Sequence, residues 1–250
     1  MGNDKNFGYL GNTFQIQLIN QLILNKDFAR SIVDVLDSKY FDNIIITETP
    51  GSSVRKDQAV QTSAWKNYNR CDAYTLSPYD RTILVDADYF INNPNTFKLL
   101  DTDQDIAVAR QYIDYITNNA LDKAWLSEFG IANCWATLMY FRKTEFTKTV
   151  FESVGYIRNH WEYYQTLYRF YNKFRNDYAF AIALHELSGG KITNEFDHPY
   201  PIKNIHSGHV LLFEKNILIG DDIAVTLGSD NLHIMDKNIA LQYANGLLNG

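Results

Sequence analysis

A short apolar strand that ends in two aspartates constrains the fold more than any other feature of this sequence. Thr82–Val85 is apolar and rich in β-branched residues, and Asp86, Ala87 and Asp88 follow it directly. In an open α/β sheet, ligands bind beyond the carboxyl ends of the strands, so both carboxylates lie where ligand chemistry takes place. We expect a turn at Ala87 that brings both carboxylates onto one cation. The alternative is a pair of surface aspartates at a strand end.

Carboxylates in this position favour a hard divalent cation. Oxygen ligands suit Mg²⁺ or Mn²⁺, especially where a diphosphate supplies further oxygens, and such a cation stabilises negative charge on a leaving phosphate. His233 follows the apolar Leu232 at the end of a predicted strand. As a neutral imidazole it is a candidate third ligand; the alternative is a buried, hydrogen-bonded histidine.

The rest of the chain after residue 43 alternates between strand and helix patterns. This alternation predicts an α/β fold with a mostly parallel sheet flanked by helices. The predicted strands are 43–47, 82–85, 105–109, 134–141, 210–213, 223–226 and 232–235, and the predicted helices are 58–69, 145–158, 160–187 with a break near 175–176, and 238–248.

The first 43 residues have a different pattern. Apolar residues recur at helical spacing over 13–25 and over 27–36, which predicts a helical hairpin at the N-terminus. We therefore expect a helical N-terminal segment, 1–43, followed by an α/β domain, 44–250.

Composition excludes several classes of protein. Hydrophobic residues make up 46% of the 250 residues and charged residues 21%, which is not typical of a disordered chain. No apolar run is long enough for a membrane span and no signal peptide is visible. The two cysteines do not form a disulfide framework, so a reducing cytoplasm is expected. The net charge of −6 does not indicate nucleic-acid binding, which would need a local basic patch.

An ordered set of motifs resembles one enzyme class. Ser77-Pro-Tyr-Asp and Val85-Asp-Ala-Asp-Tyr resemble the core of GT-A-fold glycosyltransferases, particularly the glycogenin-like and phage-encoded members. Later segments agree in order, and the resemblance covers about residues 44–250. These segments are Trp135-Ala-Thr-Leu-Met-Tyr-Phe-Arg, Arg175-Asn-Asp-Tyr-Ala-Phe-Ala-Ile-Ala-Leu and Leu232-His-Ile-Met-Asp-Lys.

The resemblance implies a GT-A-like (Rossmann-like) fold and a metal-dependent glycosyltransferase. Asp86, Asp88 and His233 would hold Mn²⁺ or Mg²⁺, with Asp88 as a direct ligand and Asp86 also near the diphosphate. The donor would be a nucleotide-diphosphate sugar, with a UDP-sugar favoured. This sequence lacks the Gly-containing loop that follows the histidine in the best-known glycogenin-like members.

Five further residues are candidates for the substrate site. By resemblance, Trp135 lines the sugar pocket, Asp177 lies near donor sugar and acceptor as the catalytic residue, and Lys237 approaches the phosphates. Arg55 and Lys56 follow a Gly-Ser-Ser loop and are candidates to bind the diphosphate. Each has an alternative interpretation: Asp177 as a helix cap, and the cations as solvated surface charges.

The N-terminal segment carries a second resemblance. Residues from Phe7-Gly-Tyr-Leu-Gly to Tyr40-Phe-Asp-Asn resemble the extreme N-terminus of the replicative DNA helicase of T-even-type phages. No Gly-rich loop followed by Lys and Ser/Thr occurs in the chain, so helicase activity is not expected. A phage origin, with the host cytoplasm as location, is implied. GT-A proteins normally open with a base-binding strand; if a helical hairpin replaces it, the enzyme is expected to be inactive.

The expected function is transfer of a sugar to an acceptor hydroxyl, on a glycan or on a modified DNA base. Two alternatives stay open. One is a phage replication module without catalysis, which docks through the N-terminal segment. The other is a degenerate sugar-binding domain.

Overall fold

The computed structural model describes most of the chain after residue 68 and a few strands before it. The described residues are 21–25, 43–47, 53–56, 62–65, 69–115, 120–121, 125–170, 173–191, 193–205, 212–214, 217–219, 224–226 and 229–249. Among them, no helix combines the length and apolar character that crossing a membrane requires.

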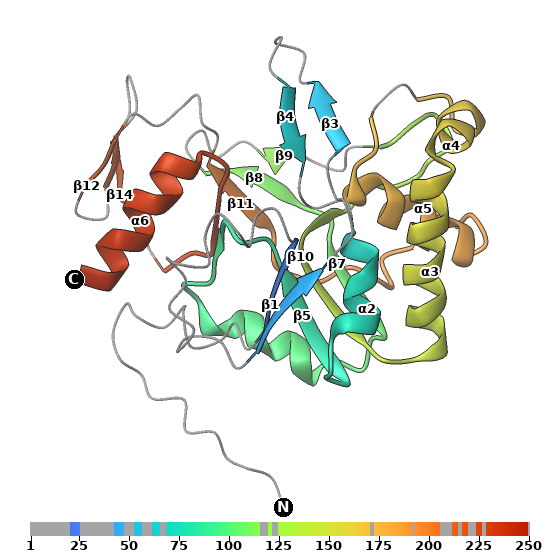
Figure 1. Cartoon of the computed structure of the whole chain (residues 1–250), viewed down its shortest axis with the longest axis horizontal. Helices are drawn as coiled ribbons and strands as arrows, with labels where there is room; N and C mark the ends of the chain where they lie inside the picture. The colour runs from blue at the N-terminus through green and yellow to red at the C-terminus, as the bar shows by residue number, and fades with distance from the viewer. Residues whose placement is uncertain are drawn as a thin grey trace, which may run out of the picture.

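A three-stranded sheet, with two buried strands and one half-buried strand, occupies the middle of the molecule (Figure 1). Its central strand, β10 (Trp135–Arg142), pairs antiparallel with β5 (Arg81–Val85) on one side and β7 (Ile106–Ala109) on the other. Ala136–Phe141 is buried without interruption, as expected of a strand that has neighbours on both edges and layers on both faces. The register between β10 and β7 shifts between Trp135 and Met139, which marks an irregularity at the start of β10.

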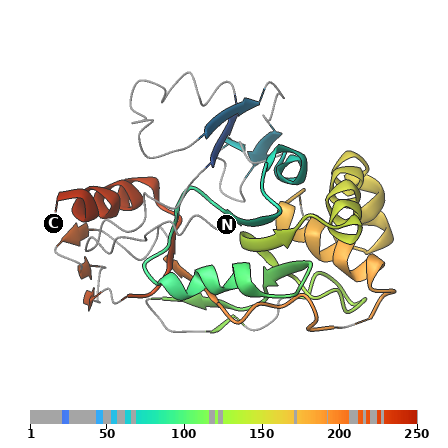
Figure 2. The ribbon, with the colours of Figure 1, turned by 90° about the horizontal axis from the view of Figure 1, so that it is seen from below.

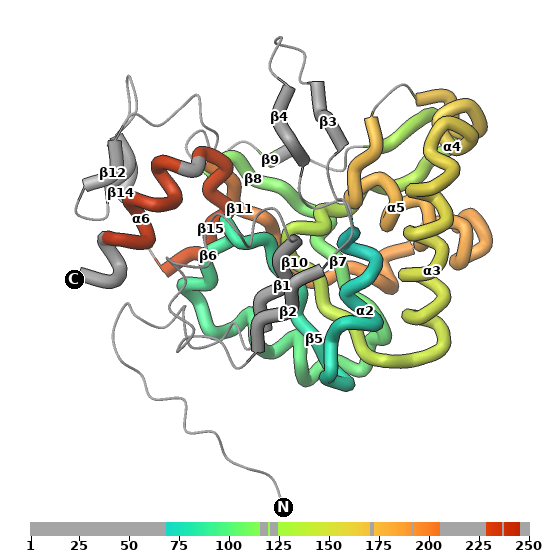
Figure 3. The backbone as a smooth tube through the Cα atoms, viewed as in Figure 1, coloured from blue at the N-terminus to red at the C-terminus, as the bar shows by residue number. Residues whose placement is uncertain are grey.

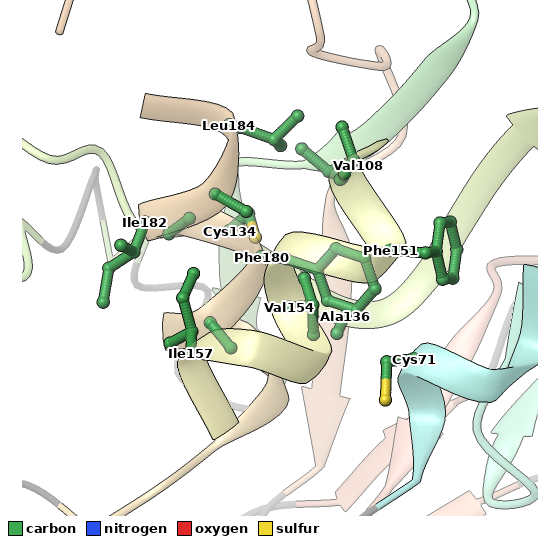
Figure 4. Close-up of a cluster of buried hydrophobic side chains, with 14 of the residues drawn as sticks. Cys71, Val108, Cys134, Ala136, Phe151, Val154, Ile157, Phe180, Ile182 and Leu184 are labelled. Carbon is green, nitrogen blue, oxygen red and sulfur yellow. The ribbon is translucent and has the colours of Figure 1, made fainter. Parts of the chain in front are cut away.

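Three helices cover this sheet: α3 (Glu145–Asn159), α4 (Trp161–Leu167) and α5 (Asn176–Leu187). The helix α3 begins at Thr144, whose side chain accepts a hydrogen bond from the Thr147 amide. It buries apolar residues at helical spacing, whereas α5 is buried on most sides as far as Leu184, between α3 and β10, and its last turn is exposed. Figure 4 shows Phe151, Val154 and Ile157 of α3 beside Phe180 and Ile182 of α5.

A second sheet is mixed in direction. Its strand order is β6 (Tyr89–Phe90), β15 (Leu232–Ile234), β11 (Ile202–Ile205), β8 (Tyr112–Asp114) and β9 (Ala120–Leu121). The three inner strands are parallel to one another and both edge strands are antiparallel to their neighbours. The closing helix α6 (Lys237–Asn249) lies at the opposite end of the molecule from α3–α5 in both views (Figures 1 and 2).

The two faces of this sheet differ. On one face, Ile205, Leu232 and Ile234 pack with Ile239 and Tyr243 of α6. The other face packs towards the three-stranded sheet, through a cluster that includes Tyr89, Tyr112, Ile202 and Leu138. Side chains on this second face therefore lie between the two sheets.

Smaller elements complete the described chain. Before the central sheet lie the parallel pair β1 (Gln21–Asn25) and β2 (Asn43–Thr47), the antiparallel pair β3 (Ser53–Lys56) and β4 (Thr62–Trp65), and the short helices η3 (Arg70–Asp72) and α2 (Ala73–Leu76). Between β6 and β7 lies η4 (Pro94–Asp101); before β15, an antiparallel sheet contains β12 (Leu212–Glu214), β13 (Ile217–Ile219) and β14 (Ala224–Thr226).

The α/β class and most predicted elements after residue 80 are confirmed. The prediction of a mostly parallel sheet is wrong, because β10 is antiparallel to both neighbours and the larger sheet is mixed. A fully buried strand is a continuous apolar run whichever way its neighbours point, so the sequence pattern of β10 does not reveal its direction. The helical stretch predicted over 160–187 with a break near 175–176 is two helices: α4 ends at Leu167, earlier than the predicted break, and α5 begins at Asn176.

Two predicted helices are wrong where the structure describes them. Gln21–Asn25, the end of the helix predicted over 13–25, is strand β1, and it pairs in parallel with β2. Thr62–Trp65, inside the helix predicted over 58–69, is strand β4. Short apolar runs fit both periods, and pairing with a neighbouring strand decides between them. The remainder of the predicted hairpin lies outside the described residues, and the domain boundary after residue 43 stays a prediction.

Candidate metal centre

The chain turns immediately after β5, at the position that the sequence predicts. The Asp86 amide donates to the Thr137 carbonyl at 2.9 Å, which holds the end of β5 against β10. The Tyr89 amide then donates back to the Asp86 carbonyl at 3.0 Å, closing a turn over Ala87 and Asp88. The turn keeps Asp88 close to the end of β5, and one ligand atom of Asp88 lies within 4.8 Å of one of Asp86.

Strand pairing brings His233 to the same turn. Strand β15 pairs with β6 so that His233 lies opposite Tyr89, and the Ile234 amide donates to the Asp88 carbonyl at 3.0 Å. The His233 Nε2 atom lies 3.4 Å from Asp88 Oδ1, and the two side chains are 14% and 16% exposed. Figure 3 shows β6 and β15 side by side at this place. Two segments distant in the sequence therefore build one site.

Asp86, Asp88 and His233 have the spacing and the chemistry of a cation site. One ligand atom from each lies within 4.8 Å of the others. Six-coordinate bonds of about 2.1 Å need donor atoms about 3–4 Å apart, so small side-chain rotations suffice. Two carboxylates and one imidazole suit Mn²⁺ or Mg²⁺, and three protein ligands leave coordination positions for oxygens of a bound phosphate.

A buried arginine, which the sequence reasoning missed, completes the charge balance of the site. The Arg70 Nη1 atom contacts Asp86 Oδ1 at 2.5 Å, and the Arg70 side chain is only 4% exposed. Its Nε and Nη2 atoms are also buried and have no hydrogen-bond partner within the described residues. The guanidinium thus neutralises part of the acidic site and keeps donors that no described group uses. Arg70 directly follows the helix predicted over 58–69 and belongs to no motif, so no sequence signal separated it from surface arginines.

Trp135 lies at the start of β10, next to the carboxyl end of β7. Its ring stacks on Tyr112 with centroids 4.5 Å apart and an interplanar angle of 28°. Both residues belong to the packing between the two sheets, and Trp135 stays partly exposed. The predicted role of Trp135 in a sugar pocket stays a prediction; the described contact is with Tyr112.

Asp177 lies in the first turn of α5, and both of its carboxylate oxygens have protein partners. Oδ1 accepts a hydrogen bond from the Ala136 amide at 2.7 Å. Oδ2 accepts from Arg175 Nε at 3.0 Å and lies 2.8 Å from Arg175 Nη2. Asp177 therefore ties α5 to β10. The alternative interpretation of Asp177 as the cap of this helix is wrong, because Arg175 is the N-cap residue and no side chain accepts a capping hydrogen bond there. Its predicted catalytic role stays a prediction.

The residues predicted to bind the phosphates are Arg55, Lys56 and Lys237. Arg55 and Lys56 end strand β3, and Lys237 is the first residue of α6, but the side chains of all three lie outside what the structure describes. Asp236 caps α6, because its Oδ1 accepts hydrogen bonds from the amides of Asn238 and Ile239 at 2.8 and 3.1 Å. These three roles stay predictions.

Neither cysteine has the properties of a nucleophile. Burial raises the pKa of the Cys71 thiol to about 11 and that of Cys134 to about 12, so both are protonated at neutral pH.

Comparison of the chain with family models, curated proteins and solved structures found no match in any of the three. The chemistry of the site therefore has to be argued from its own residues.

Proposed function

We propose that this protein is a metal-dependent glycosyltransferase with a GT-A-like fold, which moves a sugar from a nucleotide-diphosphate donor to an acceptor hydroxyl. The observation that supports this most is the convergence of Asp86, Asp88 and His233 within 4.8 Å. These residues were selected from the sequence as one ligand set, although His233 lies far along the chain from the two aspartates.

The cation, Mn²⁺ or Mg²⁺, supplies charge stabilisation for the departing nucleotide diphosphate. Asp88, in the turn before β6, and His233, in β15, would hold the cation, and the hydrogen bond from the Ile234 amide to the Asp88 carbonyl fixes the two segments to each other. Asp86 contacts both this centre and the buried guanidinium of Arg70. The unused Nε and Nη2 donors of Arg70 are suited to hydroxyl or phosphate oxygens of the donor beside the cation. The remaining work of the protein is to position the acceptor.

The opening strand also supports the proposal. A GT-A-like enzyme needs a strand before residue 43 to hold the nucleotide base, and β1 lies there in parallel with β2. The expectation of inactivity depended on a helical hairpin in this place. The acceptor, a glycan or a modified DNA base, and the phage origin stay part of the proposal without further support.

The test is nucleotide-diphosphate release from a panel of nucleotide sugars, with UDP-sugars first, measured with and without Mn²⁺. We expect release only with the cation, and we expect Asp88→Asn to abolish both release and the Mn²⁺-dependent thermal stabilisation by UDP. Asp101→Asn is the matched control, because Asp101 is an exposed aspartate at the end of η4. Stabilisation by UDP without turnover would point instead to a degenerate sugar-binding domain. No response to any nucleotide sugar would refute the proposal.

A further inference from the structure

A buried asparagine lies beside the proposed metal ligand His233. In the parallel pairing of β11 with β15, Asn204 is the register partner of His233. Register partners on neighbouring parallel strands direct their side chains to the same face of the sheet, about 5 Å apart. The neighbours Ile205 and Ile234 face α6 on the opposite side. Asn204 and His233 are thus adjacent between the two sheets.

The amide of Asn204 has an acceptor atom without a partner. The residue is fully buried, and its Oδ1 has no hydrogen-bond partner in the described part of the chain. Its Nδ2 donates to Met235 Sδ at 3.3 Å. Burial raises the pKa of Tyr112, and a side-chain hydrogen bond with Asn204 opposes that shift. Buried amide oxygens nearly always accept a hydrogen bond. We therefore expect a donor for Asn204 Oδ1 beside the candidate metal site.

His233 has the matching donor. Its Nε2 faces Asp88, and the contacts that the structure gives it among the described residues involve only that nitrogen. A neutral imidazole whose Nε2 binds a cation carries its proton on Nδ1. Metal-bound histidines almost always donate this second N–H to a carboxylate, carbonyl or water, which fixes both tautomer and ring orientation.

We infer that Asn204 is a positioning residue, whose Oδ1 accepts a hydrogen bond from His233 Nδ1–H and so directs the Nε2 lone pair to the cation. The inference rests on the metal site of the proposed function. It assigns Asn204 no contact with substrate or metal. The register of β11 and β15 supports the inference, because it places the Asn204 amide and the His233 imidazole on one face of the sheet.

The experiment compares wild type with Asn204→Leu, which keeps the volume and removes the acceptor, and with Asn204→Asp, which restores it. Long-range ¹H–¹⁵N NMR on metal-free protein at pH 8 reports the His233 tautomer. Mn²⁺ titration followed by electron paramagnetic resonance reports cation affinity. Thr147→Val is the matched control, because Thr147 is fully buried and donates its hydroxyl to the Asp105 carbonyl, in the α3 layer.

We expect the Nδ1–H tautomer in wild type, its loss in Asn204→Leu together with a roughly 10- to 100-fold weaker Mn²⁺ affinity, and recovery of the tautomer in Asn204→Asp. Thr147→Val should change neither readout. An Nε2–H tautomer in the wild type, or an unchanged tautomer in folded Asn204→Leu, would overturn the inference. If Asn204→Leu does not fold, the wild-type tautomer and Asn204→Asp decide alone. Failure of wild type to bind Mn²⁺ would instead refute the proposed function, since the tautomer is measured without metal.

Discussion

The ion pair between Arg70 and Asp86 gives the most specific prediction about the charge balance of the candidate metal site. Arg70→Met keeps most of the apolar stem and removes the charge that faces Asp86. Breaking a buried ion pair by deleting one partner costs roughly 3–5 kcal/mol. Here the loss is smaller, because the Asp86 side chain is 22% exposed and regains part of its hydration. The two unpaired N–H groups also disappear with the arginine, and each buried unpaired group costs about 1–3 kcal/mol. We therefore expect a net loss of about 2 kcal/mol.

For a chain of this size, that loss lowers the melting temperature by about 4–8 °C. The assay is thermal unfolding followed by circular dichroism, without divalent cations and then with Mn²⁺. Because a bound cation takes over the neutralisation of Asp86, we expect the deficit of Arg70→Met to shrink when Mn²⁺ is present. In an Asp86→Asn background, Arg70→Met should cost much less than in wild type. An equal loss of stability in the wild-type and Asp86→Asn backgrounds would refute the electrostatic reasoning. A loss that does not change with Mn²⁺ would show that Arg70 does not share the neutralisation of Asp86 with the cation.

Three further predictions concern the framework around the site. Burial lowers the pKa of His198 to about 4. The stability that its neutral ring contributes is therefore complete above about pH 6.5 and is lost as the pH falls towards 4. Urea unfolding of the wild type should show a loss of up to about 3 kcal/mol over that pH range, and His198→Gln should not show it. Arg169 has a φ of +51° after α4, so Arg169→Gly should be more stable than Arg169→Ala by about 1 kcal/mol, and equal melting temperatures of these two variants would argue against strain. Thr144→Ala should cost about 1 kcal/mol through loss of the α3 cap, and an unchanged urea midpoint would contradict that role.

The sequence was sufficient for the elements whose signal is local. The strand before Asp86, the buried strand β10 and the helix α3 each carry an apolar pattern with a recognisable end, and each lies close to its predicted position. The Asp-Ala-Asp motif alone led to the expectation of a turn at Ala87, and the chain turns there. Local pattern and tertiary packing agree in these segments, so either one suffices.

What the sequence could not supply depends on pairing between distant segments. Gln21–Asn25 is a strand because β2 pairs with it, and nothing in its short apolar run distinguishes that outcome from a helix. Arg70 and Asn204 acquire their significance only when burial removes water and strand register supplies a neighbour. Charged and amide side chains are common on surfaces, so neither residue stands out before the fold is known.

The central claim is that Asp86, Asp88 and His233 bind one divalent cation together with a nucleotide diphosphate. Anomalous diffraction from crystals grown with Mn²⁺ and UDP, recorded at the manganese edge, tests it directly. The account predicts a single strong peak about 2.1 Å from an oxygen of Asp88 and from His233 Nε2, with diphosphate oxygens completing the coordination. A structure with ordered UDP and no peak between these side chains, or with the peak elsewhere, would contradict it.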